Sequence, residues 1–436
     1  MRNRLSNQPR RFCAAASDAI LEMKGRDPQY CKTLMNGMPK AIQHFAHQLK
    51  IKIWLPVALT LLFLGCTSEP QFRLNSVHKL TLEKEFQDGD PFPEAHIEQV
   101  GNLVTAFFGT PDAPHFPAGY ETLVDAKHLQ RAAGPVSSDL STGQGLYRQH
   151  CAHCHGITGD GAGPTAASLN PYPRDFRLGK FKFKSTRMYR PPTDEDIRRI
   201  LERGIAGSAM PSFALLPADQ IDALVDYVKY LSIRGQVERV LLEELTNLEE
   251  GEDLLPPKTE ENQEDYEYAL ELIMELVDPV LSKWENPDAK VVPLNGFPKD
   301  FKRRLSLYSD AGKKLFFGKA NCVQCHGETG IGDGQTENYD DWTNEWLKRA
   351  NVDPNKPEQV NPFLQAGALP PRKIRPRNLR DLVFRGGSHP NDLYRRVKAG
   401  IEGSNMPAAP ALSDVEIWSL VAYLIELPYQ SIIKKD

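Results

Sequence analysis

Two six-residue segments, CAHCHG at residues 151–156 and CVQCHG at residues 322–327, hold residue types that can do chemistry. Each has two cysteines three residues apart and a histidine directly after the second: Cys151, Cys154 and His155, then Cys322, Cys325 and His326. Residues three and four apart on a helical turn point to one face, so two thiols and an imidazole surround one flat object. Each sulfur can add to a vinyl group of haem, and the histidine nitrogen can take one axial site on its iron.

Two other uses of a C-x-x-C pair have to be weighed. A redox disulfide normally belongs to a thioredoxin-like βαβ pattern, which this sequence lacks. A zinc site with two cysteines and two histidines needs a second ligand pair at a regular spacing. The remaining cysteines are Cys13, Cys31 and Cys66, all near the N-terminus. Haem attachment is therefore the favoured interpretation of both motifs.

The two motifs belong to a duplicated module. GIAGSAMP at residues 204–211 recurs as GIEGSNMP at residues 400–407, an offset of 196 residues. Behind each comes a segment whose apolar residues have helical spacing, beginning at Ile221 and at Ile417 with the same offset. A PRDF or PRNL element and a helix with a polar start stand between motif and repeat in both copies. The chain therefore contains two copies of one module.

The order of parts in each copy resembles class I cytochrome c, here in tandem. A helix, CxxCHG, a loop, Met-Pro and a final helix with a tyrosine (Tyr227 in LVDYVKYL, Tyr423 in LVAYLIEL) follow one another. The resemblance covers about residues 140–232 and 306–430. It implies an all-α fold in which a helical domain wraps each of two covalently bound haem c groups, with their iron.

The resemblance also implies the second axial ligands. The matching residues are Met210 and Met406, each followed by proline in the duplicated segment. Met188, which precedes Met210 by 22 residues, is the rival ligand.

Further residues are expected around each haem. An axial histidine usually donates its other ring N–H to a carbonyl, and in many small bacterial relatives the acceptor is a proline nine residues on. Pro164 has that place in the first copy and Gln335 in the second, so the second histidine needs another acceptor. Arg174 and Arg377 occupy matching places and are candidates to bind haem propionates, with a solvated surface arginine as the alternative for each.

The modules and the segments between them predict the domain organisation. Residues 67–138 form an N-terminal extension, 139–232 the first cytochrome c domain, 233–305 a partly helical acidic connector, and 306–436 the second domain with an inserted loop at about 335–370. Residues 243–275 hold thirteen acidic residues against one base, Lys258. The inserted loop carries Trp342 and Trp346, and we expect it to cover a haem edge or to pack onto the neighbouring domain.

The N-terminal 66 residues predict export. An apolar run at residues 53–65 follows two lysines and ends in LFLGC, which resembles a bacterial lipoprotein signal with Cys66 as the lipidated residue. A plain secretory peptide or signal anchor is the alternative. The residues before the run do not suit an exported fold, so we expect translation to start later, at Met35 or Met38. Without residues 1–66, which hold ten basic and three acidic residues, 43 basic residues face 54 acidic ones, a net charge of -11. That balance argues against a nucleic-acid partner.

Two haems with both axial sites filled predict electron transfer. We expect a lipid-anchored protein on the periplasmic face of a bacterial membrane, with a quinol-oxidising complex, a dehydrogenase or a terminal oxidase as redox partners. A dihaem peroxidase with one exchangeable ligand is the alternative, for which His115, His128 and His389 are possible ligands. A docking subunit is a third class, suggested by the acidic connector and by the basic residues between 372 and 380.

Overall fold

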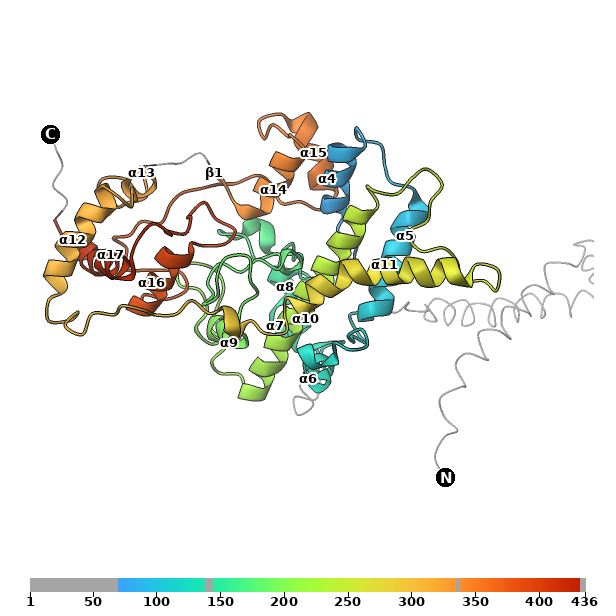
Figure 1. Cartoon of the computed structure of the whole chain (residues 1–436), viewed down its shortest axis with the longest axis horizontal. Helices are drawn as coiled ribbons and strands as arrows, with labels where there is room; N and C mark the ends of the chain where they lie inside the picture. Colours follow the sequence, from blue (N-terminus) through green and yellow to red (C-terminus); the bar gives the residue numbers. More distant parts are fainter. Residues whose placement is uncertain (1–69, 138–143, 335–337, 432–436) are drawn as a thin grey trace, which may run out of the picture. The chain divides into compact units, whose positions relative to one another are not determined.

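The computed structural model describes residues 70–137, 144–334 and 338–431. The chain divides into a unit of residues 1–68 and a unit of residues 69–436, and the described residues belong to the second (Figure 1). The expected signal segment and Cys66 therefore lie outside the described residues. Within the described ranges, no helix combines the length and the apolar character needed to cross a membrane.

The fold is all-α, as the resemblance to class I cytochrome c implied. The segment before the first motif forms α4 (Ser76–Phe86), α5 (Glu94–Phe108) and α6 (Ala126–Ala132). The side chain of Asn75 caps α4 and that of Asp125 caps α6, each by accepting a backbone N–H of the first turn. All three helices contact α10, so this extension packs against the first module.

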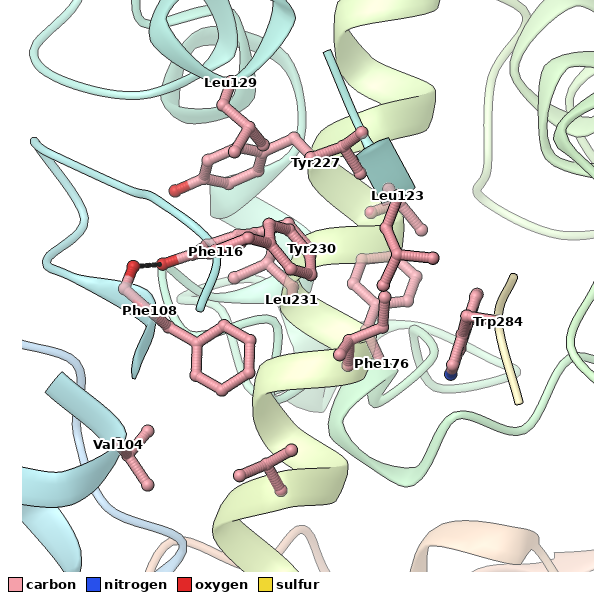
Figure 2. Close-up of a cluster of buried hydrophobic side chains, with 14 of the residues drawn as sticks. Val104, Phe108, Phe116, Leu123, Leu129, Phe176, Tyr227, Tyr230, Leu231 and Trp284 are labelled. Carbon is pink, nitrogen blue, oxygen red and sulfur yellow. Dashed lines mark hydrogen bonds between the residues drawn. The ribbon is translucent and has the colours of Figure 1, made fainter. Parts of the chain in front are cut away.

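The first module contains α7 (Leu146–His150), α8 (Ala152–His155), α9 (Asp194–Arg203) and α10 (Ala218–Glu244). Helix α10 crosses the predicted domain end at residue 232 without a break. Figure 2 shows its Tyr230 among aromatic side chains of the core, with the hydroxyl donating to the Phe108 carbonyl at 2.7 Å. Gly235 lets the chain cross α10 closely, because a Cβ there would lie 2.4 Å from Arg177 Cα.

The acidic connector contains one long helix, α11 (Gln263–Ser282), which confirms the helical spacing read from the sequence. Ile273, Val277 and Leu281 are buried, and α11 packs on α10. The glutamates of α11 and Asp265 are exposed, whereas Asp278 is partly buried. The connector is therefore attached to the first module by an apolar stripe.

The second module contains α12 (Leu305–Phe317), α13 (Val323–His326), α16 (Pro390–Ala399) and α17 (Asp414–Glu426). Helices α12 and α17 cross at Gly312, where a Cβ would lie 2.0 Å from the Ser419 carbonyl oxygen. Trp418 of α17 stacks on Tyr394 of α16 with ring centroids 4.3 Å apart. The two terminal helices of the module thus enclose its core with α16.

The insertion of the second module is more ordered than the predicted loop. It holds α14 (Asp341–Arg349) and α15 (Pro357–Gln365), flanked by β1 (Asn338–Tyr339) and β2 (Lys373–Ile374), which pair antiparallel with Asn338 opposite Ile374. Trp346 stacks on Phe363 at 4.4 Å, and Val77 and Leu80 of α4 pack against this small core. The insertion therefore packs onto the segment that precedes the first module.

Candidate haem sites

Both C-x-x-C-H motifs adopt the single helical turn that the spacing predicts. In the first, the N–H groups of Cys154 and His155 donate to the Cys151 carbonyl at 3.1 and 2.9 Å. In the second, Cys325 and His326 donate to the Cys322 carbonyl at 3.2 and 2.9 Å. The glycine after each histidine has a φ above +70°, which ends the turn at once.

The two axial-ligand candidates are held by matching hydrogen bonds. His155 Nδ1 lies 3.0 Å from the Arg174 carbonyl oxygen, and His326 Nδ1 lies 3.0 Å from that of Arg377. A carbonyl can only accept, so Nδ1 carries the proton and Nε2 keeps its lone pair for a metal. Burial lowers the pKa of His155 to about 4 and also lowers that of His326, which favours the neutral ring.

The prediction that the Pro164 carbonyl accepts the hydrogen bond of His155 is wrong, because the Arg174 carbonyl does so. The loop around Pro164 bonds instead to the main chain of the motif, with Gly163 N–H on the Cys154 carbonyl at 3.1 Å. Because Arg174 and Arg377 have equivalent places, the two copies share one acceptor position, and the difference predicted between them does not exist. Gln335 lies outside the described residues.

The cysteines are unlike those of a redox dithiol. Burial raises the pKa of the Cys151 thiol to about 12 and that of the Cys322 thiol to about 11. Reactive redox cysteines have a lowered pKa, because the thiolate is the nucleophile. These environments therefore do not favour the disulfide alternative.

The repeated GIxGSxMP segment folds into the same loop in both copies. Ile205 N–H donates to the Met210 carbonyl at 3.1 Å, and Met210 N–H donates to the Ser208 hydroxyl at 3.2 Å. The second copy repeats both bonds, at 3.0 Å to Met406 and at 3.3 Å to Ser404. A Cβ at Gly204 would lie 2.7 Å from the Met210 carbonyl oxygen, so the loop needs glycine there.

A cavity of about 270 Å³ brings the candidates of the first copy together. Its walls include Cys151, Cys154, His155, Met210 and Arg174. Most of the remaining wall is apolar, including Ile197, Ile200, Leu201, Phe181 and Val228. Two thiols, an imidazole with a lone pair and a thioether around one apolar cavity fit a covalently bound haem.

The rival ligand Met188 faces the other module. Its Cε lies 2.7 Å from where a Cβ of Gly400 would stand, beside the Met406 loop. Arg377 likewise extends toward the first module: its Nε donates to the Val383 carbonyl at 2.8 Å, and a Cβ at Gly207 would lie 3.4 Å from its guanidinium. The Arg377 side chain thus approaches the Met210 loop.

Phe176 and Arg385 are two residues of the first cavity that sequence reasoning missed and that could act on a bound haem. Phe176 stacks on the His155 ring, with centroids 4.6 Å apart and an interplanar angle of 14°. Its place in the PRDF element was a usable signal. Arg385, from the second module, lines the cavity and donates to the Gly207 carbonyl at 3.0 Å. A guanidinium there can hold a haem propionate, but nothing local in the sequence points to it.

Two protein-family models match the chain over the regions of the two sites. The family described as Cytochrome C oxidase, cbb3-type, subunit III matches residues 138–228, and the family described as Cytochrome c matches residues 309–428. A solved chain from the Kuenenia stuttgartiensis reducing HAO-like protein complex is 26% identical, with a TM-score of 0.43, over 67% of this chain and 97% of that one. No curated protein matches the chain. The chain carries two cytochrome c domains in tandem, which bind two haem c groups covalently and transfer electrons.

Proposed function

We propose that this chain transfers electrons in a periplasm-facing respiratory chain, between a quinol-oxidising complex or dehydrogenase and a terminal oxidase. Cytochrome c domains are usually exported to the periplasm, which agrees with the export segment expected at the N-terminus. Ligation by histidine and methionine raises the potential of a haem, which suits a late position in such a chain.

The candidate residues of both domains have a role in this proposal. Cys151 and Cys154 in the first domain, and Cys322 and Cys325 in the second, would attach the haems through thioether bonds. His155 with Met210, and His326 with Met406, would hold the two irons. The bound haem supplies an iron that changes oxidation state. The protein holds the histidine tautomer through the Arg174 and Arg377 carbonyls and surrounds the first group with apolar side chains.

The observation that carries the proposal is that the two methionine loops have the same hydrogen-bond pattern. Both loops hold their methionine by the same set of bonds, so under this proposal Met210 and Met406 would each supply the second axial ligand of a haem iron. An iron with both axial sites filled leaves no position for a substrate.

The peroxidase alternative needs an exchangeable ligand, and its candidates have other partners. His115 Nε2 contacts the Ala106 carbonyl at 3.0 Å, and His128 Nδ1 contacts Asp226 at 2.7 Å. His389 caps α16 by accepting the Asn391 N–H at 3.3 Å. None of these contacts favours a role at a haem.

The basic residues near position 375 also have internal contacts. Arg372 donates to the Leu169 carbonyl, and Arg380 donates to the Leu427 and Gln430 carbonyls at 3.0 and 2.7 Å. These contacts account for Arg372 and Arg380 without a docking partner.

A redox titration of the purified protein tests the function. We expect the weak iron-to-sulfur absorption band from both haems, positive potentials, and no carbon monoxide binding in the reduced form. Met210→Ala and Met406→Ala should each remove the band from one haem and open that iron to carbon monoxide. One haem without the band in the wild type, at a much lower potential and reacting with peroxide, would support the enzyme instead.

We also propose that Cys66 carries a lipid that anchors the chain at the periplasmic face of a membrane. The support is the LFLGC sequence after the apolar run. Cys66→Ser should move the protein from the membrane fraction to the soluble periplasmic fraction with both haems attached. Unchanged fractionation, with no lipid on Cys66 by mass spectrometry, would contradict the anchor.

A further inference from the structure

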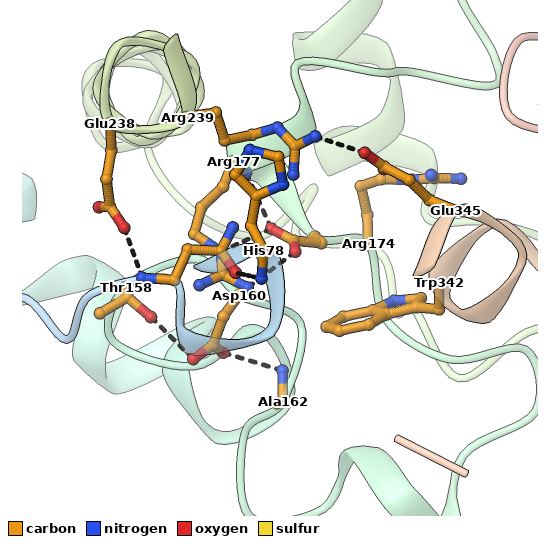
Figure 3. A network of polar contacts seen from close by, with 12 residues as sticks. His78, Thr158, Asp160, Ala162, Arg174, Arg177, Glu238, Arg239, Trp342 and Glu345 are labelled. Carbon is orange, nitrogen blue, oxygen red and sulfur yellow. Dashed lines mark hydrogen bonds and ion pairs between the residues drawn. The ribbon is translucent and has the colours of Figure 1, made fainter. Parts of the chain in front are cut away.

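Trp342, in the first turn of α14, reaches from the insertion of the second domain to the first haem site. Its Nε1 donates to the Pro173 carbonyl at 2.6 Å. Its ring lies against Gly161, where a Cβ would stand 2.1 Å from Trp342 Cζ2. Figure 3 shows the indole near Arg174 of the first domain, and near Glu345, which lies on α14 together with Trp342. One side chain of the second domain thus touches two segments of the first.

These two segments hold His155 from both sides. Gly161 N–H donates to the His155 carbonyl at 2.8 Å, which fixes the main chain of the histidine. Arg174, directly after Pro173, accepts the proton of His155 Nδ1 at 3.0 Å, which fixes its ring. Trp342 therefore lies where the two supports of the histidine meet.

The helix that carries Trp342 is itself firmly held. Trp346 stacks on Phe363 and packs with residues of α4. Arg349 pairs with Glu85 at 2.6 Å, and Glu345 pairs with Arg239 of α10. Contacts on three sides leave α14 little freedom, so the position of the indole is well defined.

The other end of the insertion clamps the same segment of the first domain. Arg372 lies over the Tyr172 ring, 3.6 Å from its centroid, and donates to the Leu169 carbonyl. The Tyr172 hydroxyl donates to the Pro370 carbonyl at 3.1 Å. The segment from Leu169 to Arg174 is thus attached to the insertion at both ends.

We propose that Trp342 is a positioning residue for the axial histidine of the first haem. Through this residue the second domain influences the redox potential of the haem in the first domain. The indole N–H holds the Pro173–Arg174 segment where the Arg174 carbonyl accepts from His155. That hydrogen bond raises the basicity of the ring and favours oxidised iron. The inference rests on the proposed function in one respect, that His155 ligates iron.

The test compares two tryptophans of the same helix. Trp342→Phe removes the N–H that bonds to Pro173. Trp346→Phe is the matched control, because Trp346 Nε1 is buried without a hydrogen-bond partner in the described part of the chain. Both variants keep an aromatic ring. A redox titration of each holoprotein resolves two haem components, assigned with Met210→Ala and Met406→Ala.

We expect Trp342→Phe to move the first haem to a more positive potential and to leave the second haem unchanged. In reduced protein with isotope-labelled histidine, the Nδ1 proton of His155 should exchange with solvent roughly tenfold faster, as for the loss of one hydrogen bond. Trp346→Phe should change neither value. Benzothienylalanine at position 342, which replaces the N–H with sulfur in a ring of the same shape, should reproduce Trp342→Phe even if phenylalanine packs poorly there.

Two results would overturn the inference. One is that both position-342 variants keep the wild-type haem potential and the wild-type exchange rate of the His155 Nδ1 proton. The other is that Trp346→Phe shifts the potential of the first haem as much as Trp342→Phe does. A failure of the proposed function looks different, because it shows in the wild-type spectrum and carbon monoxide test before any tryptophan is changed.

Discussion

Lys184→Met should destabilise the protein strongly, because it breaks an ion pair buried between the two cytochrome domains. Lys184 and Glu402 form this pair, with side chains only 4% and 5% exposed. Glu402 lies in the GIEGSNMP loop of the second domain, and it also accepts the Tyr189 N–H at 3.2 Å. The pair therefore joins the first domain to the loop that carries Met406.

The size of the effect follows from what each change leaves behind. Lys184→Met leaves a buried carboxylate with one backbone hydrogen bond and only the more distant charge of Lys283, and breaking a buried pair in this way costs about 3–5 kcal/mol. Burial lowers the pKa of Lys184 even though Glu402 opposes the shift, so desolvation outweighs attraction. Replacing both charges should therefore cost much less. For Lys184→Met with Glu402→Gln, in which the amide oxygen still accepts from Tyr189, we expect about 1 kcal/mol.

Urea denaturation of the holoprotein, followed by far-ultraviolet circular dichroism and by haem absorbance, measures both values. The exposed pair of Lys319 and Glu416 provides the control, and Lys319→Met should have a far smaller effect than Lys184→Met. The reasoning is refuted if Lys184→Met costs less than about 1 kcal/mol, or if the double variant is as unstable as the single one.

Three further predictions concern local packing, the histidine acceptor and pH. Gly312→Ala should lower the free energy of unfolding by about 1–3 kcal/mol in urea, because its Cβ would collide with the Ser419 carbonyl of α17. Pro164→Ala should leave the potential of the first haem unchanged in a redox titration, since His155 donates to Arg174; a clear shift would restore the proline as acceptor. Burial and then Arg239 lower the pKa of His78 below 6.5, while Glu243 and Glu345 oppose them. The unfolded chain therefore takes up the proton first as pH falls, and the wild type should lose more stability between about pH 7 and 5 than His78→Gln, as urea denaturation at the two pH values would show.

The haem-attachment motifs, the duplication and the helices could be predicted because each depends on contacts close in sequence. Cys151, Cys154 and His155 share one helical turn, and Gly204 permits a loop that closes within seven residues. Local spacing determines such features whatever surrounds them. The acidic connector was likewise predicted to be partly helical from its apolar stripe, which buries Val277.

The contacts between the domains could not be predicted, because no local pattern records how two separately folded modules pack. Met188 was interpreted as a ligand rival in its own domain but lies against Gly400 of the other. Arg174 was interpreted through its side chain, whereas its carbonyl holds His155. Arg385 and Trp342 contact the first haem site although they lie more than a hundred positions after it in the sequence. The sequence by itself determined that there are two C-x-x-C-H modules, and it named the residues expected to attach a haem in each. Only the tertiary structure decided that the second domain completes the first site, because that depends on surfaces brought together by packing.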